Sequence, residues 1–191
     1  YWHDRDLLNS SLPANASISI ADVTRDLATL LVTGPKAPAI LEAVTGQSTT
    51  GEDFPWLSHK TVQILGCEVT AIRVSFAGES GFEIHCKMTN VVTVFDSIME
   101  TGNKYQLRLF GMLALDSMRL EKGYRSWKAD LTSDYTMLES GLGRWINFNK
   151  DDFVGRAALQ EEYQSGSSRE FVTLALDDPE DNDSFGEAIY L

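Results

Sequence analysis

The stretch FAGESGFEIHC at residues 76–86 constrains the fold more than any other part of the chain. Phe82, Ile84 and Cys86 alternate with Glu83 and His85, and successive side chains of a β-strand point to opposite faces of the sheet. The stretch therefore predicts a strand with one apolar and one polar face, which follows a glycine-rich turn. Two interpretations are open at this point: the polar face meets water, or Glu83 points into a concave pocket.

Strand-like and helix-like periods interleave along the rest of the chain. Strand patterns cover residues 16–23, 26–33, 60–65, 68–76, 82–87 and 170–176, with a hairpin turn expected at Gly66-Cys67. Helical patterns cover residues 34–44, 90–101, 111–121 and 152–164, with Thr89 or Asn90 as the expected N-cap of the second helix. Because hairpins occur among alternating strands and helices, the expected fold class is α+β, with mixed or antiparallel sheets and packed helices.

The composition excludes several classes of function. The chain has 16 basic and 28 acidic residues, so its formal net charge is −12. This charge disfavours a general nucleic-acid surface or an anionic membrane surface, since both need basic residues. The sequence contains no run of eighteen apolar residues, so it predicts no membrane-spanning helix. Cys67 and Cys86 fall in strand patterns and are expected to be ordinary thiols, and the three histidines lack the spacing of metal ligands.

The polar face around Glu83 suggests a specific ligand chemistry. No phosphate-cradling GxxxxGKS/T, dinucleotide GxGxxG or zinc-type HExxH motif occurs in the chain. An ionised carboxylate with its two oxygens suits an amidine-like N–H/NH₂ edge, because two parallel charge-assisted hydrogen bonds fit that geometry. Phe76, on the other side of the turn, could supply a stacking face for a flat ring.

Several motifs resemble one family in order along nearly the whole chain. The segment SFAGESGFEIH is similar to the YTGExGxE segment of the folate-binding aminomethyltransferases, typified by the glycine cleavage T-protein. The later segments ALDSMRLEKGYRSWKADL, LESGLG and DFVGRAAL follow the same family. The form EKGYRSWKADL, together with IADVTRDLATLLVTGPKA, is closer to the C-terminal folate modules of sarcosine and dimethylglycine dehydrogenases.

The resemblance implies roles for individual residues. The pterin-holding glutamate of the family corresponds to Glu83, and the aromatic residue beside the folate, usually tyrosine, corresponds to Phe76. Ile84 and His85 match neighbours of that glutamate which help to form the pocket. Arg144 is in a position to meet the glutamate tail of the folate, although a surface arginine is an equal alternative.

Other positions depart from the family pattern. Leu115 stands where the T-protein has an arginine near the folate, as uncharged residues do in the dehydrogenase branch. The family's catalytic aspartate has no recognisable counterpart, because Asp4, Asp6 and Asp22 lack its surroundings, so the catalytic group is unknown. Glu79 is expected to be solvated. Arg119 and Glu121 are interpreted as a structural ion pair.

The resemblance implies a tetrahydrofolate-binding module that takes a one-carbon unit from an oxidised, small methylated amine such as sarcosine or dimethylglycine, to give 5,10-methylene-tetrahydrofolate. Residues 1–176 would form part of this domain, truncated at both ends, and residues 177–191 an acidic loop leading into a C-terminal β-module. FAD would belong to a separate N-terminal flavin domain of the same polypeptide. Such a protein would lie in the cytoplasm of a bacterium or in the mitochondrial matrix of a eukaryote.

Two alternatives are open, one from another class of function and one a second enzyme. One is a non-catalytic relative that uses the fold for protein contact, like the regulatory subunit of pyruvate dehydrogenase phosphatase. The other is a folate-dependent demethylase of another methylated substrate.

Overall fold

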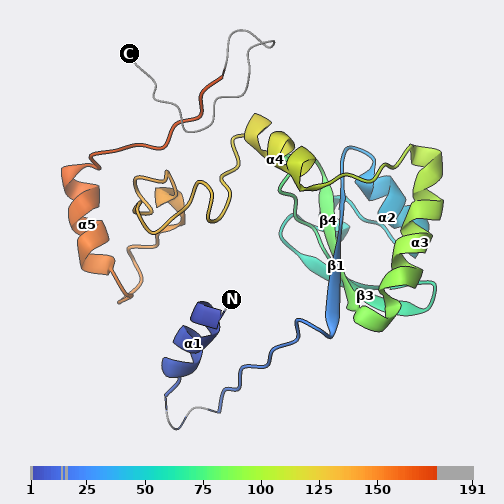
Figure 1. The fold of residues 1–191 in the computed structure, drawn as a ribbon, viewed down its shortest axis with the longest axis horizontal. Coiled ribbons are helices and arrows are strands. Elements are labelled where there is room, and N and C mark those ends of the chain that lie inside the picture. Colours follow the sequence, from blue (N-terminus) through green and yellow to red (C-terminus); the bar gives the residue numbers. More distant parts are fainter. Residues whose placement is uncertain (1, 14, 16, 176–191) are drawn as a thin grey trace. The chain divides into compact units, whose positions relative to one another are not determined.

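The computed structural model describes residues 2–13, 15 and 17–175 (Figure 1). The chain divides into two compact units, Tyr1–Tyr124 and Arg125–Leu191, which are described separately below. The helices and strands of the first unit are α1 (Trp2–Ser10), β1 (Leu27–Thr33), α2 (Ala37–Thr45), β2 (His59–Ile64), β3 (Cys67–Ile72), β4 (Gly81–Lys87), α3 (Val91–Gly102) and α4 (Met112–Glu121). The described part of the second unit contains α5 (Arg156–Ser165) and a short 3₁₀ turn at Gly143–Trp145.

One antiparallel sheet organises the first unit, with the strand order β1-β4-β3-β2. β4 pairs with β1 on one side, from Leu27 opposite Lys87 to Thr33 opposite Gly81. On its other side β4 pairs with β3, and β3 pairs with β2 in a hairpin. Helices and an antiparallel sheet in one chain confirm the α+β class expected from the sequence.

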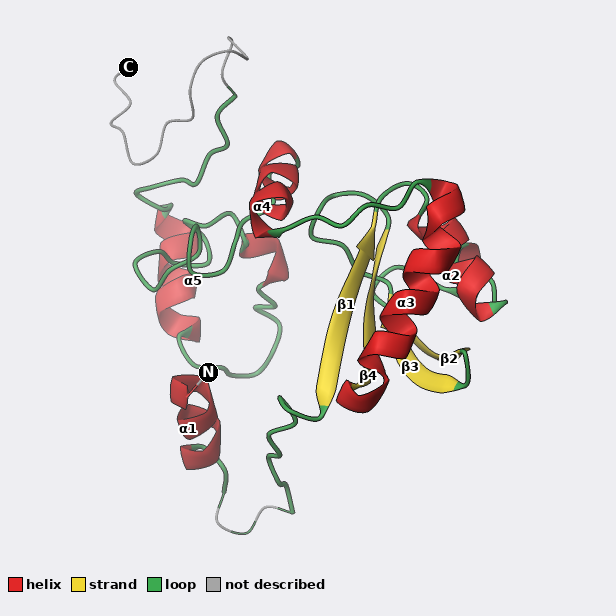
Figure 2. Ribbon diagram, turned by 45° about the vertical axis from the view of Figure 1, so that its right-hand side comes forward, coloured by secondary structure: helices red, strands yellow, loops and turns green. Residues whose placement is uncertain are grey.

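The core lies between one face of this sheet and two helices. Figure 2 shows α2 and α3 on the same side of the strands, and both helices contact β4. Phe82, Ile84 and Cys86 are buried on this face, as their alternation predicts. The ring of Phe82 packs against that of Phe54, with 5.5 Å between the centroids. Cys86 and Cys67 are free thiols, and burial raises the pKa of Cys86.

The hairpin between β2 and β3 turns at Leu65-Gly66, one residue earlier than expected. Both residues have positive φ, 47° at Leu65 and 77° at Gly66, which is the signature of a two-residue type I′ turn. The predicted strand 68–76 ends at Ile72. Beyond Ile72, the Arg73 N–H donates to the carbonyl of Ser58 while the Arg73 carbonyl accepts from the N–H of Leu57, so the one-to-one register of the ladder is lost.

Asn90 is the N-cap residue of α3, as expected, although the helix follows a 3₁₀ turn and Asn90 makes no side-chain capping bond. Two other expectations were wrong. Residues 17–23 carry strand-like alternation but are exposed and form no strand. Residues 170–175 form no strand either, since the Phe171 N–H donates to the carbonyl of Glu139 instead. The acidic run 177–187 lies outside the described residues.

Candidate functional site

The second face of the sheet, which points away from α2 and α3, carries Glu83. Its register places Glu83 directly opposite Leu31 of β1 and Ile72 of β3. Both neighbours are half-buried, and the side chain of Glu83 is 41% exposed. A carboxylate between two apolar side chains is partly desolvated, which strengthens the charge-assisted hydrogen bonds that it can accept.

His85 contacts Glu83 directly on the same face. Its Nε2 lies 3.0 Å from Oε2 of Glu83, and its Nδ1 lies 3.0 Å from Oγ1 of Thr29 on the neighbouring strand β1. An ionised carboxylate only accepts hydrogen bonds, so Nε2 carries the hydrogen and donates it to Glu83. Thr29, His85 and Glu83 therefore form a continuous hydrogen-bonded row, which we call the second-face row.

The loop between β3 and β4 presents an aromatic pair. Phe76 is 38% exposed, and its ring stacks on Tyr124, with 6.3 Å between centroids and 23° between planes. Glu79 of the same loop, expected to be solvated, is half-exposed and lies 3.5 Å from the ammonium of Lys122. The loop is thus held against the chain segment that follows α4.

Tyr124 is fixed in turn by a buried arginine. Arg119 of α4 is 4% exposed, bonds to Asp116, and donates from its guanidinium to the carbonyl of Tyr124 at 2.9 Å. The sequence predicts Glu121 as the ion-pair partner of Arg119, but the structure gives Asp116, three residues earlier on the same helix face. This arrangement positions the second ring of the aromatic pair.

One predicted site residue lies on the other face of the sheet, and another belongs to the second unit. The side chain of Ile84 is fully buried in the core, on the opposite face of the sheet from Glu83. Arg144 belongs to the second unit, where its guanidinium lies over the ring of Trp145 at 5.1 Å from the centroid. The structure thus brings together Glu83 and His85, and it places Phe76 in the loop that precedes their strand.

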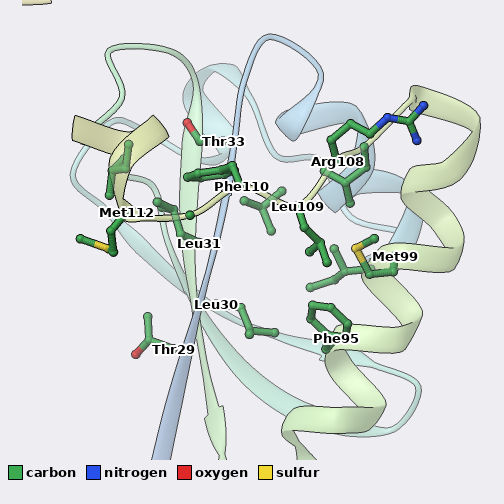
Figure 3. Close-up of a pocket in the computed structure, with 15 residues that line it drawn as sticks. Thr29, Leu30, Leu31, Thr33, Phe95, Met99, Arg108, Leu109, Phe110 and Met112 are labelled. Atoms are coloured by element: carbon green, nitrogen blue, oxygen red, sulfur yellow. The ribbon is translucent and has the colours of Figure 1, made fainter. Parts of the chain in front are cut away.

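An apolar cavity of about 350 Å³ lies beside β1, and its lining includes Thr29 and Leu31 from the neighbourhood of Glu83. Figure 3 shows side chains from β1, from α3 and from residues 107–115 around it. Leu115 lines this cavity and Glu83 does not, so the concave pocket expected around Glu83 does not coincide with it. Among the described residues, no cluster of three or more metal-ligating side chains occurs and no helix is long and apolar enough to span a membrane.

Comparison with known proteins identifies the family. Residues 2–150 match the model of the GCVT N-terminal domain. The chain belongs to the GCVT family. It is 34% identical to human mitochondrial dimethylglycine dehydrogenase over 95% of its length, and 36% identical to human mitochondrial sarcosine dehydrogenase over 83%. It is also 35% identical to the aminomethyltransferase of Caldanaerobacter subterraneus over 83% of its length.

The chain spans only part of these GCVT relatives. It covers 22% of the dimethylglycine dehydrogenase, 17% of the sarcosine dehydrogenase and 42% of the aminomethyltransferase. The family membership and the resemblance stated from the motifs agree, including the relation to both dehydrogenases.

Sequence reasoning missed four residues at this site. Leu31, Ile72 and Thr29 surround Glu83 and His85 only because of the strand order, which a single sequence does not reveal. Tyr124 had a local signal, since it is an aromatic residue directly after Gly123, the glycine with φ of 68° that follows α4.

Proposed function

We propose that this chain is a tetrahydrofolate-binding module that takes up a one-carbon unit from an oxidised methylated glycine, such as sarcosine or dimethylglycine, to give 5,10-methylene-tetrahydrofolate. The observation that carries the proposal is the carboxylate of Glu83, held by His85 between Leu31 and Ile72. It offers two acceptor oxygens in a partly apolar setting, which fits the flat N–H/NH₂ edge of a pterin. Membership of the GCVT family supports this assignment.

Each residue of the site then has a role in binding. Glu83 accepts hydrogen bonds from the pterin N–H and amine, and Phe76, stacked with Tyr124, supplies a flat apolar surface. Arg144 is the proposed partner of the folate glutamate tail. Bound tetrahydrofolate supplies the amine that captures the one-carbon unit. The chain's own contribution is to bind and orient the two reactants, and such positioning accounts for much of the rate gain in many two-substrate enzymes.

The other parts of the proposal concern the whole protein. FAD would reside in a separate flavin domain of the same polypeptide, which would oxidise the methylated amine. The protein would lie in the mitochondrial matrix in a eukaryote, as the names of the human relatives suggest, or in the cytoplasm of a bacterium.

Substitution of Glu83 tests the proposal. In the full-length protein, Glu83→Ala should weaken tetrahydrofolate binding roughly ten- to hundredfold, because about two charge-assisted hydrogen bonds are lost and water replaces part of them. Glu79→Ala is the matched control, since Glu79 lies four residues earlier in the loop and pairs with Lys122. Isothermal titration calorimetry measures both affinities. Equal losses in the two variants, or no binding by the unsubstituted protein, would contradict the proposal.

One observation favours a protein-contact function as the second candidate. Leu115 lines an apolar cavity where a T-protein-like arginine would have offered charge, and Leu109, Met112 and Leu113 near it are strongly exposed. A relative that uses this surface for a protein partner would bind no tetrahydrofolate, so the same calorimetry separates the two candidates. A folate-dependent demethylase of another substrate would bind tetrahydrofolate but fail to turn over sarcosine or dimethylglycine.

A further inference from the structure

We propose that His85 and Thr29 are positioning residues that fix the carboxylate of Glu83 for its ligand. This inference rests on the proposed folate site and goes beyond it by assigning how the acceptor group is oriented. It depends on the second-face row, in which both ring nitrogens of His85 have a partner at 3.0 Å.

The row leaves Glu83 with a defined set of free acceptor positions. Oε2 accepts from His85, and Oε1 and a further lone pair of Oε2 have no partner among the described hydrogen bonds, which leaves them for a ligand. Without this hydrogen bond, a glutamate side chain that is 41% exposed would rotate among several rotamers. A ligand would then have to fix one rotamer, and the side-chain entropy lost in doing so would oppose binding. Holding one oxygen before the ligand arrives removes part of this cost.

Thr29 makes the arrangement independent of the protonation state of the ring. When His85 is neutral, the Thr29 hydroxyl donates to Nδ1, and when the ring is protonated, the same hydroxyl oxygen accepts from Nδ1–H. In both states Nε2 keeps its hydrogen and donates it to Glu83. On this face the other charged groups of the strands next to His85 are Lys87 on β4 and Glu68 on β3, and β1 contributes none.

The sheet contains a matched control for Thr29. The register places His85 opposite two threonines, Thr29 on β1 and Thr70 on β3. Among the described hydrogen bonds, the partner of Nδ1 is Thr29. A Thr→Val substitution at either position keeps the side chain's shape, so the pair isolates the effect of the hydroxyl.

The test measures binding of 5-formyltetrahydrofolate, a stable reduced folate, to the full-length protein by titration calorimetry. His85→Leu should weaken binding roughly three- to tenfold, because one orienting hydrogen bond is lost. His85→Gln should restore the affinity to within about twofold, since the Gln amide can donate near the position of Nε2. Thr29→Val should weaken binding about two- to threefold, and Thr70→Val should leave it unchanged.

A double substitution separates positioning from direct contact. In a Glu83→Ala background, His85→Leu should have no further effect, because the group that it orients is absent. If it still weakens binding there, His85 acts on the ligand or the fold directly and the inference is overturned.

The inference also fails if Glu83→Ala weakens binding while His85→Leu and Thr29→Val do not, although the proposed function then stands. Absence of folate binding by the unsubstituted protein would instead remove the proposed function. If His85→Leu does not fold, as judged by its melting temperature, the Thr29→Val and Thr70→Val pair decides the question.

Discussion

Two glycines in the turn before β4 are required for different physical reasons. Gly78 has a φ of 74°, and a Cβ there would lie 2.1 Å from Cγ of Lys122. Gly81 has an ordinary backbone, but a Cβ there would lie 2.9 Å from Cβ of Ser75 and 3.0 Å from the carbonyl oxygen of Val74. The first glycine allows the turn and the second allows the close approach that starts β4 beside Glu83.

Gly81→Ala should lower the free energy of unfolding by about 1–3 kcal/mol, because the added methyl group overlaps backbone and a short side chain that cannot move far. Gly111→Ala is the control, since a Cβ at Gly111 would meet no atom within 4 Å. Because Gly111 is the N-cap of α4, where alanine is less favourable than glycine, that change should cost up to about 1 kcal/mol and less than Gly81→Ala. Urea unfolding measures both values, and equal losses would contradict the explanation from close approach.

The hairpin β2–β3 carries a strained residue in its turn. Leu65 adopts a φ of 47° and is 73% exposed, so an L-residue with a large side chain occupies a conformation that glycine or asparagine adopts more readily. No packing of the Leu65 side chain offsets this cost at such exposure. The tight turn itself is fixed by the pairing of Ile64 with Cys67.

Leu65→Asn should therefore raise the free energy of unfolding by about 0.5–1 kcal/mol. Leu65→Ala keeps a Cβ in the left-handed region and should bring no such gain, so it serves as the control at the same position. Thermal unfolding of the two variants gives the comparison. A gain of the same size in Leu65→Ala would mean that removing an exposed apolar side chain, and not relief of backbone strain, is responsible.

Elements with a clear period were predicted well from the sequence, and their ends were not. The alternation of Phe82, Ile84 and Cys86 placed Glu83 and His85 on one face, which the structure confirms. The early end of β3 depends on hydrogen bonds between Arg73 and the segment at 57–58, which local patterns do not encode. Residues 17–23 have the period of a strand but no pairing partner among the described strands. Period alone does not make a strand, because each strand needs a neighbour.

At the scale of the whole molecule, the second unit is tied together by a charged pair. Glu139 is 7% exposed and accepts from Arg169 at both carboxylate oxygens, at 2.9 and 3.0 Å, and its Oε2 also accepts from the N–H of Thr136. The hydrogen bond from Arg169 holds the pKa of Glu139 below its ordinary value of 4.5, with a further contribution from the Thr136 N–H. The contacts join residues thirty positions apart.

A lowered pKa in the folded state means that ionised Glu139 stabilises the second unit above the unfolded pKa, and that this stability is lost as pH falls through the folded value. Glu139→Gln should therefore reduce protection of the Phe171 amide from hydrogen exchange at neutral pH, since that amide donates to the Glu139 carbonyl. The difference from the unsubstituted protein should shrink at pH values below about 4.5. Exchange measured by NMR at matched pH provides the test, and a difference that is constant with pH would exclude the ionised pair as its cause.

Within the candidate site, the sequence predicts contacts between residues that are close along the chain, but not contacts between residues on different strands. Glu83 and His85 are two residues apart, so strand geometry alone put them together. Thr29 is separated from His85 by 56 positions, and its contact depends on β1 lying beside β4. The same limit explains why the sequence predicted Phe76 at the site but did not anticipate its stacking on Tyr124.

The pairing of β1 with β4 also sets the order in which the site can form. The hairpin β2–β3 and the helix α2 are local, whereas β1 must wait until β4 has been synthesised and a long loop has closed. Until β1 pairs with β4, Glu83 lacks its neighbour Leu31 and His85 lacks its partner Thr29. Because Thr29 contacts His85 only across the β1–β4 pair, the second-face row is completed when β1 joins the sheet, and the same step pairs the edge of β4 that would otherwise stay open to another strand.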